Sequence, residues 1–160
     1  MKSKGQTRRE FCAHACQAAS VATVAGVLGS VLQACGGNSN PSSPSGFQSL
    51  PVIGATPANG SVALTIDSAS PLAAVGSAAL IQTTGEFILV AKTAQDTFVA
   101  LNGMCTHQAC TITGFGSGTF VCPCHGSQFT TSGRVVSGPA PAPLAQHQTH
   151  FANGVLTIAL

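Results

Sequence analysis

The chain has 160 residues, enough for one domain with its own core, but only 6% of them are charged, which is low for a globular protein. The charges crowd at the N-terminus, and no Lys, Arg, Asp or Glu occurs between Glu10 and Asp67. Beyond residue 35 two basic and three acidic side chains remain, so there is no basic patch and nucleic-acid binding has no electrostatic support.

The N-terminal segment has the pattern of an export signal. Arg8 and Arg9 precede an apolar stretch at about residues 18–32, and the pair resembles the twin-arginine signal that carries folded proteins across the bacterial inner membrane. The stretch ends in Leu32-Gln33-Ala34-Cys35, which resembles a bacterial lipobox. We expect a signal peptide over residues 1–34 and a lipid on Cys35; an uncleaved membrane anchor and an ordinary cleaved signal are the alternatives. All three place the remainder outside the cytoplasm, on the periplasmic side of a bacterial membrane.

A linker is expected to follow over residues 35–60. Residues 36–46 consist of Gly, Asn, Ser and Pro, which offer no side chain that could form a core. We therefore expect a flexible tether, with folded structure beginning near Val52 or Val62 and a domain over residues 61–160.

The predicted elements of this domain are β-strands. Short runs rich in β-branched residues are separated by Gly, Asp, Ser or Thr, and Asn153-Gly154 between the last two runs is a strong hairpin signal. No segment of 10 residues holds a helical period. The runs are 62–66, 78–82, 86–92, 97–102, 144–151 and 155–160. The sequence therefore predicts an all-β domain.

Two short boxes contain four of the seven cysteines. They read Cys-Thr-His-Gln-Ala-Cys over residues 105–110 and Cys-Pro-Cys-His-Gly-Ser over residues 122–127. Two disulfides would leave both histidines unexplained, and no Cys-X-X-Cys redox pair is present. A zinc site would also use two cysteines and two histidines, although zinc fingers usually take both cysteines from one knuckle. One Cys and one His from each box suit a binuclear cluster, in which one iron takes two sulfurs and the other two imidazoles.

The two boxes together resemble those of the Rieske [2Fe–2S] family, in its high-potential, disulfide-containing form. The resemblance covers roughly residues 60–160 and is strongest over 105–141. It implies an antiparallel β-sandwich with a small cluster-binding subdomain of two loops, at about residues 103–141. It also implies one [2Fe–2S] cluster for each chain. The implied ligands are Cys105 and Cys122 on the inner iron, and His107 and His125 on the outer, solvent-facing iron.

Further roles carry over from the family to matching positions. Cys110 and Cys124 would form a disulfide between the boxes, and Ser127 would donate a hydrogen bond to a cluster sulfur. A proline-rich covering loop is implied at Gly138, Pro139, Ala140 and Pro141. Two positions depart from the quinol-oxidising pattern: Phe129 stands where a tyrosine is expected, and Gln108 where a shielding leucine is common.

The implied function is one-electron transfer outside the inner membrane, as a carrier or as the small subunit of a periplasmic oxidoreductase. The implied partners are a cytochrome c or a larger oxidoreductase subunit, and the membrane through the lipid anchor. The main alternative is the iron–sulfur subunit of a quinol–cytochrome c reductase of the cytochrome bc type, for which quinol would be a partner. Export and the disulfide argue against a dioxygenase ferredoxin, and a structural zinc module is the non-redox alternative.

The remaining polar residues give no second site. His147 and His150 are expected on opposite faces of a strand, as surface residues. Lys92 and Arg134 are expected to be solvated charges.

Overall fold

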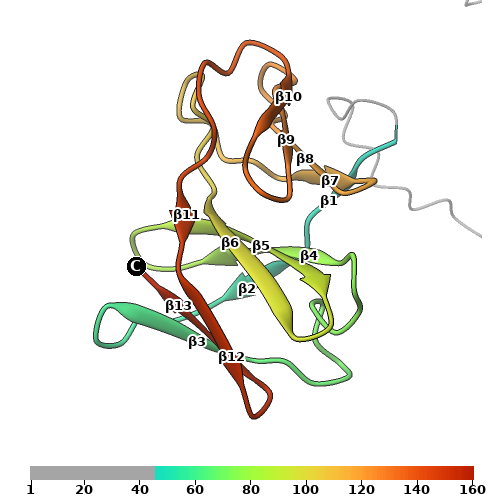
Figure 1. The fold of residues 1–160 in the computed structure, drawn as a ribbon. Coiled ribbons are helices and arrows are strands. Elements are labelled where there is room, and N and C mark those ends of the chain that lie inside the picture. Colours follow the sequence, from blue (N-terminus) through green and yellow to red (C-terminus); the bar gives the residue numbers. More distant parts are fainter. Residues whose placement is uncertain (1–45) are drawn as a thin grey trace, which may run out of the picture. The chain divides into compact units, whose positions relative to one another are not determined.

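The computed structural model describes residues 46–160, which form thirteen strands in three sheets and no helix (Figure 1). The sheet orders are β1-β7-β8-β9-β10, β11-β6-β5-β4-β2 and β12-β13-β3. The all-β prediction is confirmed. The strand bounds are β1 Gln48–Ser49, β2 Val52–Gly54, β3 Ser61–Thr65, β4 Ala78–Gln82, β5 Phe87–Ala94, β6 Thr97–Asn102, β7 Gly114–Gly116, β8 Thr119–Val121, β9 Gln128–Thr130, β10 Val135–Ser137, β11 Gln146–His147, β12 Thr149–Ala152 and β13 Val155–Ala159.

The central strands β4, β5 and β6 are buried on both faces. Alternate residues of a strand point to opposite sides, and here each side has its own core. Leu80 and Leu89 belong to a cluster shared with the first sheet, whereas Ile81 and Ile88 belong to a cluster shared with the third. This double burial explains why β4 and β5 read as continuous apolar runs and not as alternating ones.

The C-terminal hairpin is as predicted, but the strand before it is divided. Asn153 and Gly154 both have positive φ, as a two-residue hairpin turn requires, and β12 pairs with β13 around them. The predicted strand over residues 144–151 is instead two strands in two sheets, because β11 pairs with β6 and β12 with β13. The segment therefore crosses from the second sheet to the third.

Folded structure begins close to the earlier of the two expected starting points, Val52, and therefore before the expected domain boundary at residue 61. Strand β1 pairs with β7, and β2 runs parallel to β4, whereas the other pairings among the described strands are antiparallel, as the expected sandwich requires. Between them Leu50 is buried, and its N–H donates to the Thr113 carbonyl. Residues 48–54 thus connect the first sheet to the second. Residues 35–45 of the expected linker, with Cys35 among them, and the expected signal lie outside the described residues.

Two polar residues are less exposed than expected. Lys92 is buried because its aliphatic stem lies in the core, while its Nζ donates to the Ala73 carbonyl at 2.8 Å and lies 5.5 Å from the Phe98 ring centroid. His147 is half-buried. Its Nδ1 lies 3.0 Å from the Ala159 carbonyl, and its Nε2 lies 3.2 Å from Glu86 Oε1 without making a hydrogen bond. His150 and Arg134 are exposed, as expected.

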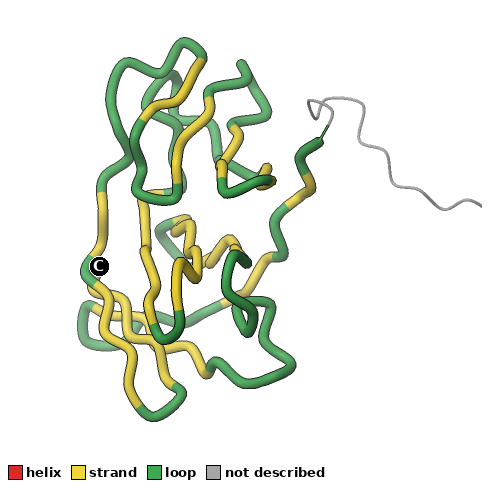
Figure 2. The backbone as a smooth tube through the Cα atoms, turned by 45° about the vertical axis from the view of Figure 1, so that its right-hand side comes forward, coloured by secondary structure: helices red, strands yellow, loops and turns green. Residues whose placement is uncertain are grey.

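The part of the chain that follows β6 contains the short strands β7 to β10 and long loops (Figure 2). Within residues 46–160, no helix has the length and hydropathy needed to cross a membrane.

Candidate functional site

The first box is positioned by the end of β6, through a glycine that has no room for a side chain. Gly103 donates its N–H to the Phe87 carbonyl at 2.7 Å. A Cβ at this position would lie 2.7 Å from the same oxygen, closer than real Cβ atoms come. The Gly103 carbonyl in turn accepts from the Ile112 N–H, beyond the box. Both ends of the first box are therefore fixed to the second sheet. This sheet and the third, β12-β13-β3, are together named the base below.

The two boxes are closed by the same backbone hydrogen bonds. In the first, the Ala109 N–H donates to the Cys105 carbonyl and the Cys105 N–H to the Cys110 carbonyl, both at 2.8 Å. In the second, the Gly126 N–H donates to the Cys122 carbonyl at 3.0 Å, and the Cys122 N–H donates to the Ser127 carbonyl at 2.9 Å. The fifth residue of each box, Ala109 or Gly126, has positive φ. Two different sequences therefore build one type of turn, and each turn begins with a cysteine.

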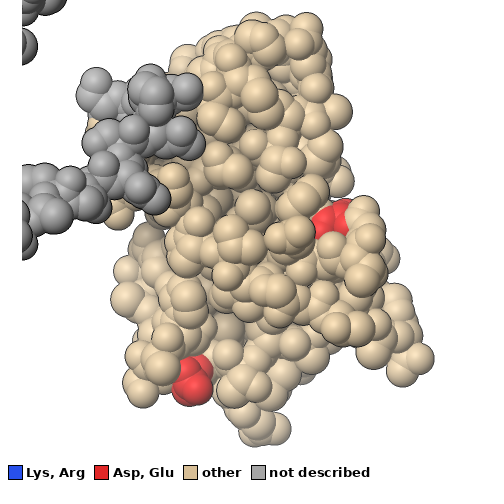
Figure 3. Space-filling view, turned by 180° about the vertical axis from the view of Figure 1, so that it is seen from behind, with Lys and Arg blue, Asp and Glu red and all other residues tan. Residues whose placement is uncertain are grey.

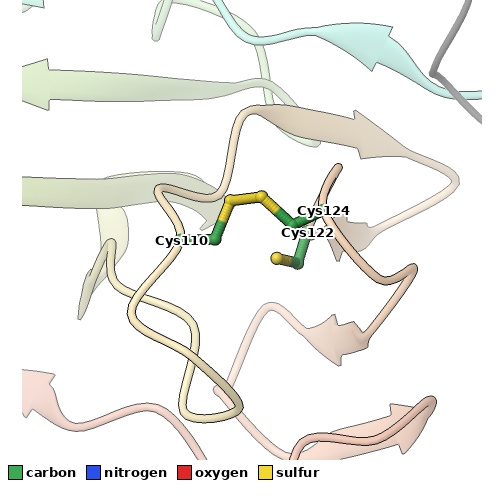
Figure 4. A group of neighbouring side chains, drawn as sticks. All are labelled: Cys110, Cys122 and Cys124. Atoms are coloured by element: carbon green, nitrogen blue, oxygen red, sulfur yellow. A yellow bond between two sulfur atoms is a disulfide. The ribbon is translucent and has the colours of Figure 1, made fainter.

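A disulfide joins the two turns. Cys110 and Cys124 are bonded, with their Cα atoms 6.5 Å apart, which confirms the predicted disulfide (Figure 4). Cys105 and Cys122 are free and buried, at 3% and 1% exposure. The Cys122 sulfur lies within 4.8 Å of both disulfide sulfurs, but those two are already bonded and cannot act as thiolates. Within residues 46–160, the sulfurs free to bind a metal are therefore those of Cys105 and Cys122.

The two histidines of the boxes lie together at the surface end of the site. Their ring centroids are 4.7 Å apart, and the rings meet edge to face at 84°. His125 is exposed and His107 is half-buried. Nδ1 of His107 is buried and has no hydrogen-bond partner among the described residues. Because a buried polar nitrogen without a partner is costly, this atom points to a ligand that the protein chain itself does not supply.

The electrostatics of the buried thiols also favour a bound cation. Burial raises the pKa of the Cys122 thiol above its ordinary value. The backbone N–H of Cys124 opposes this rise, the neighbouring Cys105 adds to it, and the backbone N–H of His125 opposes it more weakly. The backbone N–H groups of Cys124 and His125 would stabilise negative charge on the Cys122 sulfur. A metal ion would supply the remaining stabilisation that the thiolates need.

The expected covering loop contacts the second box, and Ala142, the residue after it, contacts the first. The Ala140 N–H donates to Ser127 Oγ at 3.2 Å, and Thr106 Oγ1 donates to the Ala142 carbonyl at 2.7 Å. Gly138 has a φ of 93°, and a Cβ there would lie 2.6 Å from Ser127 Cα. The Ser127 hydroxyl is fully buried and accepts from Ala140, which leaves its own hydrogen available to a further acceptor.

The residues present fit a two-iron cluster. The thiols of Cys105 and Cys122 influence each other directly, and the imidazoles of His107 and His125 form a second pair. Among the described residues, the one convergent group of three possible metal ligands is Cys122 with the disulfide pair. The four expected ligands therefore do not converge on one point, as the ligands of a tetrahedral zinc ion would. A pair of thiolates and a separate pair of imidazoles suit one iron each.

Sequence reasoning missed two contributors to the site. Thr106 ties the first box to Ala142, the residue after the covering loop, and Ala109 adopts the left-handed backbone that closes the first turn. The role of Thr106 could have been suspected because it lies between two expected ligands, Cys105 and His107. For Ala109, the matching position of Gly126 in the second box was the signal.

Comparison with known proteins agrees with this site. The family model of the Rieske [2Fe-2S] domain matches residues 64–148. The cytochrome b6-f complex iron-sulfur subunit of Prochlorococcus marinus (strain AS9601) is 54% identical over 46 residues, which is 28% of this chain and 26% of that protein. The same subunit of Synechococcus elongatus is 42% identical over 60 residues, 37% of this chain and 33% of that protein. The matches thus span only about a quarter to a third of these relatives.

Solved structures show the same fold. The plasma membrane Rieske protein PetC3 from Synechocystis PCC 6803 superposes with a TM-score of 0.51 and 27% identity, covering 61% of this chain and 99% of that one. A naphthalene 1,2-dioxygenase structure superposes with a TM-score of 0.50 at 18% identity, covering 61% of this chain and 25% of that one. The second likeness concerns the fold alone.

A methyl group at Gly138 should push the covering loop away from the second box. We expect Gly138→Ala to lower the free energy of unfolding by about 1–3 kcal/mol more than Gly118→Ala, as overpacking of close contacts typically does. Gly118 is the matched control because it also has positive φ but has nothing within 4 Å of an added Cβ. Thermal and chemical denaturation of both variants measures the difference. Equal destabilisation would mean that the loop does not lie against Ser127.

Proposed function

The chain belongs to the Rieske [2Fe–2S] domain family and is a [2Fe–2S] electron carrier, and we propose that Cys105, Cys122, His107 and His125 hold its cluster. The observation that carries this assignment is the buried, unpartnered Nδ1 of His107 beside a second imidazole, in two disulfide-joined turns that each also contain a buried free thiol. We further propose that the protein works outside the inner membrane, as a carrier or as the small subunit of an oxidoreductase.

Some groups of the chain would bind the cluster, and others would adjust its reduction potential. When bound, such a cluster exchanges one electron at about −150 to +300 mV, because two imidazoles replace two thiolates. Because Cys105 and Cys122 are buried, water is kept from their sulfur atoms. His125 is exposed, so its ring faces solvent and an incoming partner. The Ser127 hydroxyl and the N–H groups of Cys124 and His125 favour added negative charge nearby, which raises the potential.

A second candidate function is that of the iron–sulfur subunit in a quinol-oxidising complex. It is favoured by the 54% identity to the cytochrome b6-f subunit over 46 residues. Against it, Phe129 provides no hydroxyl and Gln108 is an exposed polar residue where that pattern has an apolar one. We therefore place an electron carrier first and a quinol-linked subunit second. A structural zinc module is disfavoured, because the four ligands do not converge.

The compartment is proposed from three independent features. The disulfide between Cys110 and Cys124 needs an oxidising environment. The similar PetC3 is a plasma membrane protein. The twin arginine and lipobox patterns suit export of a folded protein and a lipid on Cys35, with a signal over residues 1–34.

Removal of an imidazole tests the ligand assignment. His125→Ala should abolish the characteristic low-temperature EPR spectrum of the dithionite-reduced protein, because the outer iron would lose one of its two imidazoles. His150→Ala is the matched control, since His150 is also exposed but belongs to β12 in the base. An unchanged spectrum in His125→Ala would show that this residue is not a ligand.

Phe129→Tyr should raise the reduction potential. Phe129 is fully buried in the same hydrophobic core as Cys105 and Cys122. A tyrosine hydroxyl at this position could donate to the Cys105 sulfur. A hydrogen bond to a charged group contributes about 1.5–3 kcal/mol, of which roughly 1 kcal/mol would differ between redox states. At about 59 mV per tenfold change for one electron, the expected rise is roughly 40 mV.

Protein-film voltammetry at one pH measures this shift. Phe98→Tyr is the control, because Phe98 is also buried but belongs to the other core cluster. If the potential of Phe129→Tyr stays the same or falls with the cluster intact, residue 129 does not face the thiolate.

Cys35→Ala tests the proposed anchor. The variant should not be acylated and should keep its signal, so metabolic labelling with palmitate should mark the wild type alone. Equal labelling of both proteins would contradict the lipid on Cys35.

A further inference from the structure

The imidazole ring of His147 connects the two sheets of the base. His147 belongs to β11 of the second sheet, and its Nδ1 lies 3.0 Å from the carbonyl oxygen of Ala159, which belongs to β13 of the third. Its Nε2 lies 3.2 Å from Oε1 of Glu86, the residue before β5. This nitrogen is buried and has no hydrogen-bond partner within residues 46–160. The His147 and Glu86 side chains are 14% and 28% exposed, so water screens the contact only in part.

The contact with Ala159 determines which ring nitrogen carries a hydrogen. A carbonyl oxygen can only accept a hydrogen bond, so Nδ1 of His147 must be the N–H donor. A neutral imidazole has one N–H, and its Nε2 would then direct a lone pair at the Glu86 carboxylate, which also offers lone pairs alone. Two such acceptors 3.2 Å apart in a half-buried contact repel each other. A proton on Nε2 converts this repulsion into an ion pair.

No other charged group competes for either member of the pair within the described part of the chain. His147 with Glu86 is the one ion pair there, so no Lys or Arg reaches the carboxylate, and no second carboxylate, that of Leu160 included, reaches the imidazole. Lys92 is bound to the Ala73 carbonyl. The face in Figure 3 agrees, because its acidic groups stand apart and no Lys or Arg is visible beside them. The remaining titratable residues outside the two boxes are all exposed: Asp67, Asp96, Arg134 and His150.

The pair lies where the chain returns from the covering loop to the base (Figure 1). On one side the carbonyl of Ala145, two residues before His147, accepts from the backbone N–H of the last residue of β6. On the other side Glu86 precedes Phe87, whose carbonyl holds Gly103 just before the first box. The pair therefore fixes the returning strand to the same end of β5 that supports the first box.

We propose that Glu86 and His147 form a pH-sensitive latch, which holds the returning strand β11 to β5 and β13. With a proton on Nε2, the imidazolium ion attracts the carboxylate while its Nδ1 donates to the Ala159 carbonyl, and the latch is closed. When that proton passes to solvent, two acceptors face each other and β11 is held less tightly. The latch involves none of the proposed cluster ligands, so the latch and the proposed function can fail independently.

The direction of the pH effect follows from proton binding. The unfolded chain releases a histidine proton at about pH 6.5, whereas the closed latch retains it. Because the folded state then binds more protons than the unfolded state, the stability that the latch contributes is complete in mildly acidic solution. It is lost as the pH rises through neutrality.

Removal of the carboxylate tests the latch. Glu86→Gln keeps the shape of the side chain, and its amide N–H can donate to a neutral Nε2, so the variant needs no proton there. Chemical denaturation of the full-length protein from about pH 6 to about pH 9 should show the unfolding equilibrium constant of the wild type rising about ten-fold relative to that of Glu86→Gln. Asp96→Asn is the matched control, because it removes an exposed carboxylate in the turn at the other end of β5 and should follow the wild type. A ratio that does not change with pH would overturn the latch.

Nitrogen-15 NMR of the histidine rings detects the proton directly. At about pH 7 the His147 ring of the full-length wild type should carry a proton on both nitrogens, whereas in Glu86→Gln it should carry one on Nδ1 alone. The signal is identified by its loss in His147→Asn and its retention in His150→Asn. A neutral ring in the wild type, or one with its hydrogen on Nε2, would show that Glu86 and Ala159 do not hold the proton, and would overturn the proposal.

Discussion

The disulfide between Cys110 and Cys124 is the constraint on which the site depends. Strands β7 to β10 have three residues each, too few to fix the distance between two loops by pairing alone. The disulfide joins turns whose bonded cysteines are 14 residues apart, and each turn is already closed by its own two backbone hydrogen bonds. The positions of the four proposed ligands follow from these closures. The covering loop and Ala142 after it then add hydrogen bonds to both boxes from a third segment.

The base holds this small subdomain in place by being buried on both sides. One core lies between the second and third sheets, and the other reaches from the second sheet to Cys105, Cys122 and Phe129. The buried thiols are thus part of a hydrophobic core as well as of the proposed metal site. Gly103 marks the crossing, because the chain passes so close to Phe87 that only a glycine fits. Residues 48–54 make a second connection between the two sheets.

The chemistry of the site could be predicted from the sequence, but its mechanical support could not. Cysteines and histidines carry their chemistry in their identity, so the two boxes were sufficient to indicate the cluster. The base strands were visible because they are long and rich in β-branched residues. Strands β7 to β10 were missed because three residues show no recognisable alternation. Strands β1 and β2 were assigned to the linker, since their pairing depends on distant partners.

Burial of polar groups was equally hidden from the sequence. Lys92 was expected in solvent, yet its charge is satisfied by the Ala73 carbonyl and the Phe98 ring, contacts that only the folded chain brings together. The prediction of one strand over residues 144–151 was wrong for a similar reason. The two halves of this segment pair with different sheets, and periodicity within one segment does not reveal a change of partner.

The same scarcity of charge shapes both the interior and the surface of the subdomain. Coulomb interactions between side chains act over many ångströms, but beyond residue 97 Arg134 is the one residue with a permanent charge that could contribute to them. In the proposed cluster site, fixed dipoles at short range would therefore set the energy of an added electron, above all the N–H groups of Cys124 and His125 and the Ser127 hydroxyl. These dipoles are held by the closed turns and by the covering loop. The backbone geometry that places the ligands thus also determines how readily the site accepts negative charge.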